Sequence, residues 1–151
     1  MTMEVRGSKA SRSKIAPEIF GRRFFTRIEA NSTLPLVSRI TRDLVKQYQT
    51  FNGLHTRLQD AMLNDKPSDD IPVLESQREI AMQRLNGYVN ELTELGCELK
   101  DWEIGLVDFP ALLDGREVCL CWKSGEEGIE FWHETSTGFP GRQPIKPDDH
   151  L

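Results

Sequence analysis

The sequence predicts an α+β fold: a long antiparallel helical hairpin of coiled-coil-like spacing, followed by a three-stranded antiparallel β-meander. Two observations predict it. Apolar residues recur every three or four positions along the middle of the chain, and after Gly96 this period shortens to two. Asp114-Gly115 then lies between two of the period-two segments, where it favours a two-residue hairpin turn.

Length and composition indicate one globular domain. The chain has 151 residues, of which 38% are hydrophobic and 28% charged, too apolar for wholesale disorder. No apolar run is long enough to span a bilayer, and the net charge of −5 disfavours a protein that coats nucleic acid. The three cysteines, an odd number, argue against a disulfide framework. We therefore expect a cytoplasmic protein.

Residues 1–23 differ from the rest of the chain. They are rich in Ser, Arg and Lys and show no apolar period, which predicts a basic, disordered tail. Two alternatives are open: a tether to nucleic acid or anionic lipid, and an organelle transit segment, which Glu4 and Glu18 disfavour. The single ordered domain then covers residues 24–143, and a flexible tail follows at 144–151.

The domain is predicted to begin with a capped turn at residues 24–34. Thr26 and Glu29 stand at the spacing of a capping box, in which each side chain binds the other residue's backbone N–H. The first long helix follows at residues 35–64, because Pro35 suits the first helical position.

The second helix is predicted at residues 72–96. Pro72 opens it in the same way, and Gly96 ends it because glycine readily adopts the left-handed conformation of a helix C-terminus. A polar linker containing Pro67 separates the two helices, which makes them antiparallel neighbours. The seam between them consists of Val37, Ile40, Leu44, Tyr48, Phe51, Leu54, Leu58 and Met62 on the first helix and Leu74, Ala81, Leu85, Tyr88, Leu92 and Leu95 on the second.

The β-meander is predicted over residues 97–134, with strands at 105–113, 116–122 and 129–134. A turn at Asp114-Gly115 pairs Leu113 with Arg116 and fixes which side chains share a face. One face is apolar: Val107, Phe109, Ala111, Val118, Leu120 and Trp122, with Ile129, Phe131 and His133 added if the third strand aligns apolar to apolar. The other is mixed: Leu106, Asp108, Pro110, Leu112, Cys119, Cys121, Lys123, Glu130, Trp132 and Glu134.

Acidic and histidine residues at the open end of the meander form a candidate functional cluster. His133 suits a metal ligand or a general base, with a structural core-edge histidine as the alternative. Asp108 either protects a sheet edge or joins Glu130 in holding a divalent cation. The predicted register argues against a metal site made from Asp108, Glu134 and His133, because His133 points to the opposite face from the other two. Only a bulge or a strand end near His133 would bring them together. The full cluster is Asp108, Glu126, His133, Glu134 and Arg142.

Three residues define a candidate contact surface: Trp132, Glu130 and Cys121. Trp132 is expected on the mixed face, where an exposed indole favours a protein partner. Cys121 and Cys119 project the same way, which suits either zinc binding with a carboxylate or two small buried hydrophobic residues. No cofactor motif is recognised and no metal ligand set is assigned, which leaves a divalent metal open.

Several short motifs, taken together, resemble a known family. The sequence is similar over residues 24–144 to the uncharacterised bacterial domain-of-unknown-function family 2203, sometimes labelled as related to cell-division initiation. The resemblance implies this fold and a bacterial cytoplasmic setting, and it supplies no catalytic role. The motifs are Phe25-Thr26, Glu29-Ala30-Asn31, Leu34-Pro35, Gly105-Leu106-Val107-Asp108-Phe109, Leu120-Cys121-Trp122, Gly125-Glu126, Phe131-Trp132-His133-Glu134, Gly138-Phe139 and Gly141-Arg142.

Three functions follow as hypotheses. The leading one is a non-enzymatic protein-interaction or homo-oligomeric assembly module, because the hairpin carries more apolar residues than one helix pair can cover. A charge at Leu44 or Leu85, or Trp132→Ala, is expected to disrupt such an assembly. The second is a small metal- or ligand-binding enzyme at the open end of the meander, and the third is nucleic-acid binding by residues 1–23. The apolar residues off the seam are Leu36, Val45, Val73, Ile80 and Val89.

Overall fold

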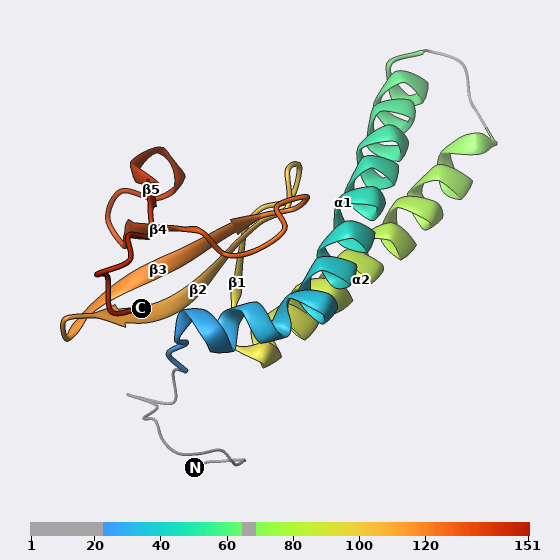
Figure 1. The fold of residues 1–151 in the computed structure, drawn as a ribbon. Helices are drawn as coiled ribbons and strands as arrows, with labels where there is room; N and C mark the ends of the chain where they lie inside the picture. Colours follow the sequence, from blue (N-terminus) through green and yellow to red (C-terminus); the bar gives the residue numbers. More distant parts are fainter. Residues whose placement is uncertain (1–22, 65–68) are drawn as a thin grey trace, which may run out of the picture.

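The structure, a computed structural model, describes residues 23–64 and 69–151 (Figure 1). In these residues two helices precede a five-stranded antiparallel sheet, which confirms the predicted α+β class and corrects the number of strands from three to five. The basic tail predicted at residues 1–23 lies, except for its last residue, outside the described residues. The elements are α1 (Arg27–Leu63), α2 (Asp70–Leu95), β1 (Glu98–Asp101), β2 (Leu106–Leu113), β3 (Arg116–Lys123), β4 (Phe131–Glu134), the short 3-10 helix η1 (Phe139–Gly141) and β5 (Gln143–Pro144).

α1 is one continuous helix, not a capped turn followed by a second start. The capping box is present: Thr26 Oγ1 accepts the Glu29 N–H at 3.1 Å, and Glu29 Oε1 accepts the Thr26 N–H at 2.9 Å. Pro35 lies inside the helix, because burial of Leu34 and Val37 on either side of it outweighs the backbone hydrogen bond that proline removes. α1 curves along its length (Figure 1), as a helix with an internal proline commonly does.

α2 begins two residues earlier than predicted, so Pro72 stands within its first turn. Gly96 ends the helix in the left-handed conformation, with φ of 99°, and its N–H binds the Leu92 and Thr93 carbonyls. The two helices pack antiparallel, and near the sheet their seam is completely buried at Leu44 and Leu85.

The β2–β3 hairpin has the predicted register. Leu113 pairs with Arg116 and Phe109 with Leu120. The turn residues Asp114 and Gly115 have φ of 51° and 83°, the positive values that a tight two-residue hairpin turn requires. The apolar face of this hairpin packs against the helices, and its side chains there are Val107, Phe109, Ala111, Leu113, Val118, Leu120 and Trp122.

The two strands that the sequence analysis missed lie at the edges of the sheet. β1 has four residues and a register shift between Leu99 and Asp101. β5 has two residues and contains Pro144, which cannot donate a backbone hydrogen bond. Short, charged or proline-containing edge strands are a common protection against unwanted pairing, and they carry too little apolar alternation to be recognised.

The predicted register of the third strand was wrong. Ladder pairing begins at Phe131, and Trp132, not Phe131, pairs with Leu120 on the apolar face. Ile129 reaches the core from the segment before the strand, where its N–H binds Asn31 Oδ1 at 2.8 Å. The alternation therefore breaks at Glu130, and the side chain of His133 points to the face opposite the helices.

The segment after β5, expected to be a flexible tail, contacts the body of the protein. The Ile145 N–H donates to the Glu130 carbonyl at 2.9 Å, and the Arg27 N–H at the start of α1 donates to the Leu151 carbonyl at 3.2 Å. Ile145 and Leu151 both pack against the core, and Figure 1 shows the C-terminus beside the first turn of α1. Within the described residues, neither helix combines the length and apolar character needed to cross a membrane.

Candidate functional site

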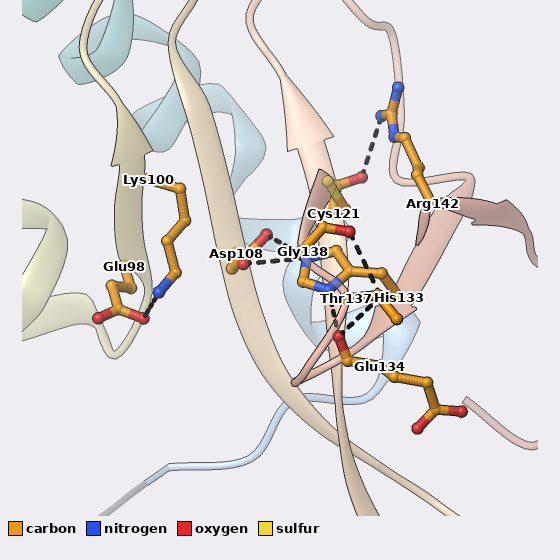
Figure 2. Close-up of polar contacts among 9 residues, drawn as sticks. All are labelled: Glu98, Lys100, Asp108, Cys121, His133, Glu134, Thr137, Gly138 and Arg142. Atoms are coloured by element: carbon orange, nitrogen blue, oxygen red, sulfur yellow. Dashed lines mark hydrogen bonds and ion pairs between the residues drawn. The ribbon is translucent and has the colours of Figure 1, made fainter. Parts of the chain in front are cut away.

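The face of the sheet that points away from the helices carries a buried polar cluster of Asp108, Cys121 and His133 (Figure 2). Three adjacent strands supply one residue each. Asp108 on β2 pairs directly with Cys121 on β3, and His133 on β4 lies one step along the ladder, opposite Cys119. None of the three cluster residues is more than 2% exposed. Burial of three polar side chains this deep requires each to have a partner.

Asp108 and His133 are hydrogen-bonded to each other. His133 Nε2 lies 3.0 Å from both carboxylate oxygens of Asp108, and Nδ1 lies 2.7 Å from the Glu134 carbonyl oxygen. Figure 2 shows the carboxylate and the ring facing each other across the sheet. Because both ring nitrogens face acceptors, the geometry fits an imidazolium ion that donates one N–H to each.

Burial controls the electrostatics of the cluster. It raises the pKa of Asp108 above its ordinary value, and the hydrogen bond from His133 acts in the opposite direction. On the neighbouring strand β1, Lys100 Nζ binds Glu98 Oε1 at 2.8 Å, and this contact raises the pKa of Lys100. The Lys100–Glu98 pair therefore places a positive and a negative charge together beside the buried carboxylate.

The thiols of Cys119 and Cys121 are held in the protonated form at neutral pH. Burial, followed by repulsion from the Asp108 carboxylate, raises the pKa of both Cys119 and Cys121 to about 12. A nucleophilic cysteine needs a depressed pKa and a base that can take its proton, whereas here both nitrogens of His133 are already engaged. The arrangement therefore lacks the features of a Cys–His catalytic pair.

A second polar group joins the β3–β4 loop to the C-terminal segment. Arg142 Nη2 donates to Glu126 Oε1 and, at 3.3 Å, to the Cys121 carbonyl oxygen. Glu126 Oε1 also accepts the Lys123 N–H at 2.8 Å, and the Arg142 guanidinium lies 3.9 Å from the centre of the Phe131 ring. These contacts hold the loop in place, so the pair has a structural role.

A pocket of about 470 Å³ opens between the first turns of α1 and the β3–β4 loop. Asp108, Cys121 and His133 are not among its lining residues, so the buried polar cluster and this pocket do not form one substrate site. Its lining residues are Asn31, Leu34, Pro35, Ser38, Trp122, Glu126 and Glu127.

Comparison with known proteins adds one finding. A family described as an uncharacterised conserved protein, DUF2203, matches residues 23–145. The chain belongs to the DUF2203 family. No curated protein and no solved structure gives a match.

The structure brings together only part of the predicted functional cluster. Asp108 and His133 are in direct contact, contrary to the predicted register, and Glu126 pairs with Arg142. Glu134 is separate: it binds Arg116 at 2.7 Å beside the β2–β3 turn, on the other face of the sheet from His133.

The predicted contact surface needs a correction. Trp132 is buried, with 6% of its surface exposed, and belongs to the core of this DUF2203 protein. Cys121 is also buried, whereas Glu130 is exposed. These three residues therefore do not form an exposed patch. The sequence analysis did not identify Glu98 and Lys100 because it did not predict β1, the strand that carries them.

Proposed function

We propose that this DUF2203 protein is a non-enzymatic interaction module that forms a homodimer through the distal part of its helical hairpin. We call this part the arm and define it as residues 51–63 and 70–82. The arm extends away from the sheet (Figure 1), and the observation that supports the proposal is its exposed apolar surface. The exposed fractions are 64% for Met62, 81% for Leu63, 54% for Val73 and 46% for Ile80.

These exposed residues are additional to those that hold the two helices together, and they include Met62, which was wrongly predicted to lie in the seam. Leu58 and Leu74 are buried in the intramolecular seam of the arm. Val73 and Ile80 stand seven residues apart on the outer side of α2, a separation that brings two side chains to the same face of a helix. Apolar side chains in such a row are typical of a surface that packs against another helix.

Gly87 continues the same row by another seven residues. A glycine inside a helix costs about 1 kcal/mol relative to alanine, so its presence calls for a reason. Among the residues that the structure describes, nothing lies within 4 Å of the position that a Cβ atom would take at Gly87, so no contact with them requires glycine there. Close approach of a helix from a second copy would use this position.

A second copy is the partner that fits this surface best. In a twofold dimer the same surface occurs on both subunits, so each exposed apolar row meets an equivalent row, and two hairpins make a four-helix bundle. We place the dimer in the cytoplasm, a proposal supported by the three cysteines, all of which are free thiols.

Sedimentation velocity at micromolar concentration tests the proposal. We expect the wild-type chain to be a dimer and Val73→Glu/Ile80→Glu to be a monomer with unchanged helix content. Ile28→Glu is the matched control, because Ile28 is 82% exposed but lies at the start of α1, far from the arm. A monomeric wild-type chain would contradict the proposal, as would equal dissociation in the control.

A further inference from the structure

We propose that Asp108, Cys121 and His133 form a Zn²⁺ site built into the sheet. This goes beyond the assembly function, because the cluster lies on the sheet and the arm is a separate part of the hairpin (Figure 1). The three side chains each offer a ligand atom (a carboxylate oxygen, a thiol sulfur and an imidazole nitrogen), and these atoms lie within 4.8 Å of one another. Mixed nitrogen, sulfur and oxygen ligands are the set that zinc accepts.

The distances within the cluster are close to those of a coordination sphere. His133 Nε2 lies 3.0 Å from each of the two Asp108 carboxylate oxygens. A zinc ion bound at about 2.0–2.1 Å from the nitrogen and from an oxygen fits this separation. Cys121 pairs with Asp108 across the β2–β3 ladder, and its sulfur lies within 4.8 Å of a carboxylate oxygen of Asp108 and a ring nitrogen of His133. An ion that enters among these three side chains replaces the hydrogen bond between His133 Nε2 and the Asp108 carboxylate.

The outer hydrogen bond of His133 prepares Nε2 to be the ligand atom. Histidines that bind metals usually donate the other ring N–H to a carbonyl or carboxylate, which fixes the tautomer and the orientation of the ring. Here Nδ1 makes that bond to the Glu134 carbonyl at 2.7 Å. The Thr137 hydroxyl binds the same carbonyl at 3.2 Å, which fixes the acceptor in turn.

The ligand set matches the charge of zinc. A carboxylate from Asp108 and a thiolate from Cys121 balance the two positive charges of Zn²⁺, and a neutral imidazole from His133 completes the protein ligands. The bound ion therefore leaves no unbalanced charge in the buried site.

In the described part of the chain, two cations beside the cluster are each paired with a carboxylate, which reduces their repulsion of a bound metal ion. Lys100 is paired with Glu98, and Arg142 with Glu126. Three protein ligands leave the fourth position of a tetrahedral zinc for water.

The test uses the full chain, stripped with a chelator and then titrated with Co²⁺ as a spectroscopic probe and with Zn²⁺ in competition with a chromophoric chelator. We expect one equivalent of metal and an absorption band from thiolate-to-cobalt charge transfer. Cys121→Ser should abolish the band and weaken Zn²⁺ binding by at least about tenfold. Cys97→Ser is the matched control, because Cys97 is also buried but binds the Leu92 carbonyl, away from the cluster.

Each outcome decides the proposal. Absence of binding by the wild-type chain would overturn it, as would an unchanged cobalt band in Cys121→Ser. If Cys121→Ser fails to fold, as judged by circular dichroism, Asp108→Asn replaces it with the same expected loss of Zn²⁺ affinity. Sedimentation in the presence of chelator measures the dimer separately, so failure of the zinc site leaves the arm proposal standing.

Discussion

The two halves of the helical hairpin have similar apolar spacing, but only the arm leaves a row of apolar side chains largely exposed. Near the sheet, Leu44 and Leu85 are completely buried, because the sheet adds a second layer against the helix pair. On the arm, Val73 and Ile80 remain largely exposed, because none of the described elements covers them as a second layer. The seam between the helices is buried in the arm as well, at Leu58 and Leu74. Helical periodicity therefore identifies apolar residues, and for those off the seam the layer beyond the hairpin decides whether they form core or a surface available to a partner.

The N-terminus of α1, beside the sheet, is also more stabilised by its capping residues than the N-terminus of α2 on the arm. α1 begins beside the sheet with a complete capping box formed by Thr26 and Glu29. α2 begins at the tip of the arm, where Asp69 makes no side-chain hydrogen bond to the helix N-terminus. Local stabilisation is therefore concentrated at the sheet end, and we expect substitutions there to reduce stability most.

The largest expected effect separates the two halves directly. Leu85→Asp places a carboxylate in the buried seam and should cost more than about 4 kcal/mol, enough to prevent folding at 25 °C. Ile80→Asp, five residues earlier on α2, should leave the fold intact and weaken only the dimer. Circular dichroism and sedimentation velocity on the two variants distinguish these results. Unfolding by both would show that the arm is part of the core.

This comparison also corrects the expectation that a charge at Leu44 or Leu85 breaks an assembly. Both residues belong to the intramolecular core, so loss of a dimer in such variants would follow from unfolding. The arm positions Val73 and Ile80 are the ones that report on association.

The next effect tests the buried pair on the opposite face of the sheet. His133→Leu leaves the Asp108 carboxylate buried without its partner and should cost about 3–5 kcal/mol in the free energy of unfolding. Replacing both residues with leucine should recover most of that loss, because no charge is then buried. Urea denaturation in the presence of a chelator measures both. Equal losses in the single and double variants would show that the pair matters only through its volume.

The sequence predicted the parts of the fold that local chemistry determines. The positive-φ residues Asp114 and Gly115 fix the β2–β3 register, and Gly96 fixes the end of α2. Pro35 misled the prediction, because its helix-starting preference is a local signal that burial of Leu34 and Val37 outweighs.

The candidate site was harder to predict, because it depends on contacts between strands. Alternation from Ile129 implied that His133 faces the helices. Ile129 instead reaches the core before the strand begins, held by Asn31 of α1, and Trp132 takes the core position opposite Leu120. A contact between residues far apart in sequence thus reversed the face of the strand and brought His133 to Asp108.

The smallest expected effect concerns the helix starts. Thr26→Ala removes the hydroxyl that accepts the Glu29 N–H and should lower the free energy of unfolding by about 1 kcal/mol, whereas Thr26→Ser keeps an acceptor and should restore most of it. Asp69→Ala should change stability by less than about 0.5 kcal/mol, because no cap hydrogen bond is lost. Urea denaturation of the three variants at one protein concentration gives these differences without a contribution from changes in dimer population. If Asp69→Ala costs as much as Thr26→Ala, the tip of the arm is more tightly organised than its exposed apolar surface indicates, and stability is shared along the hairpin instead of concentrated beside the sheet.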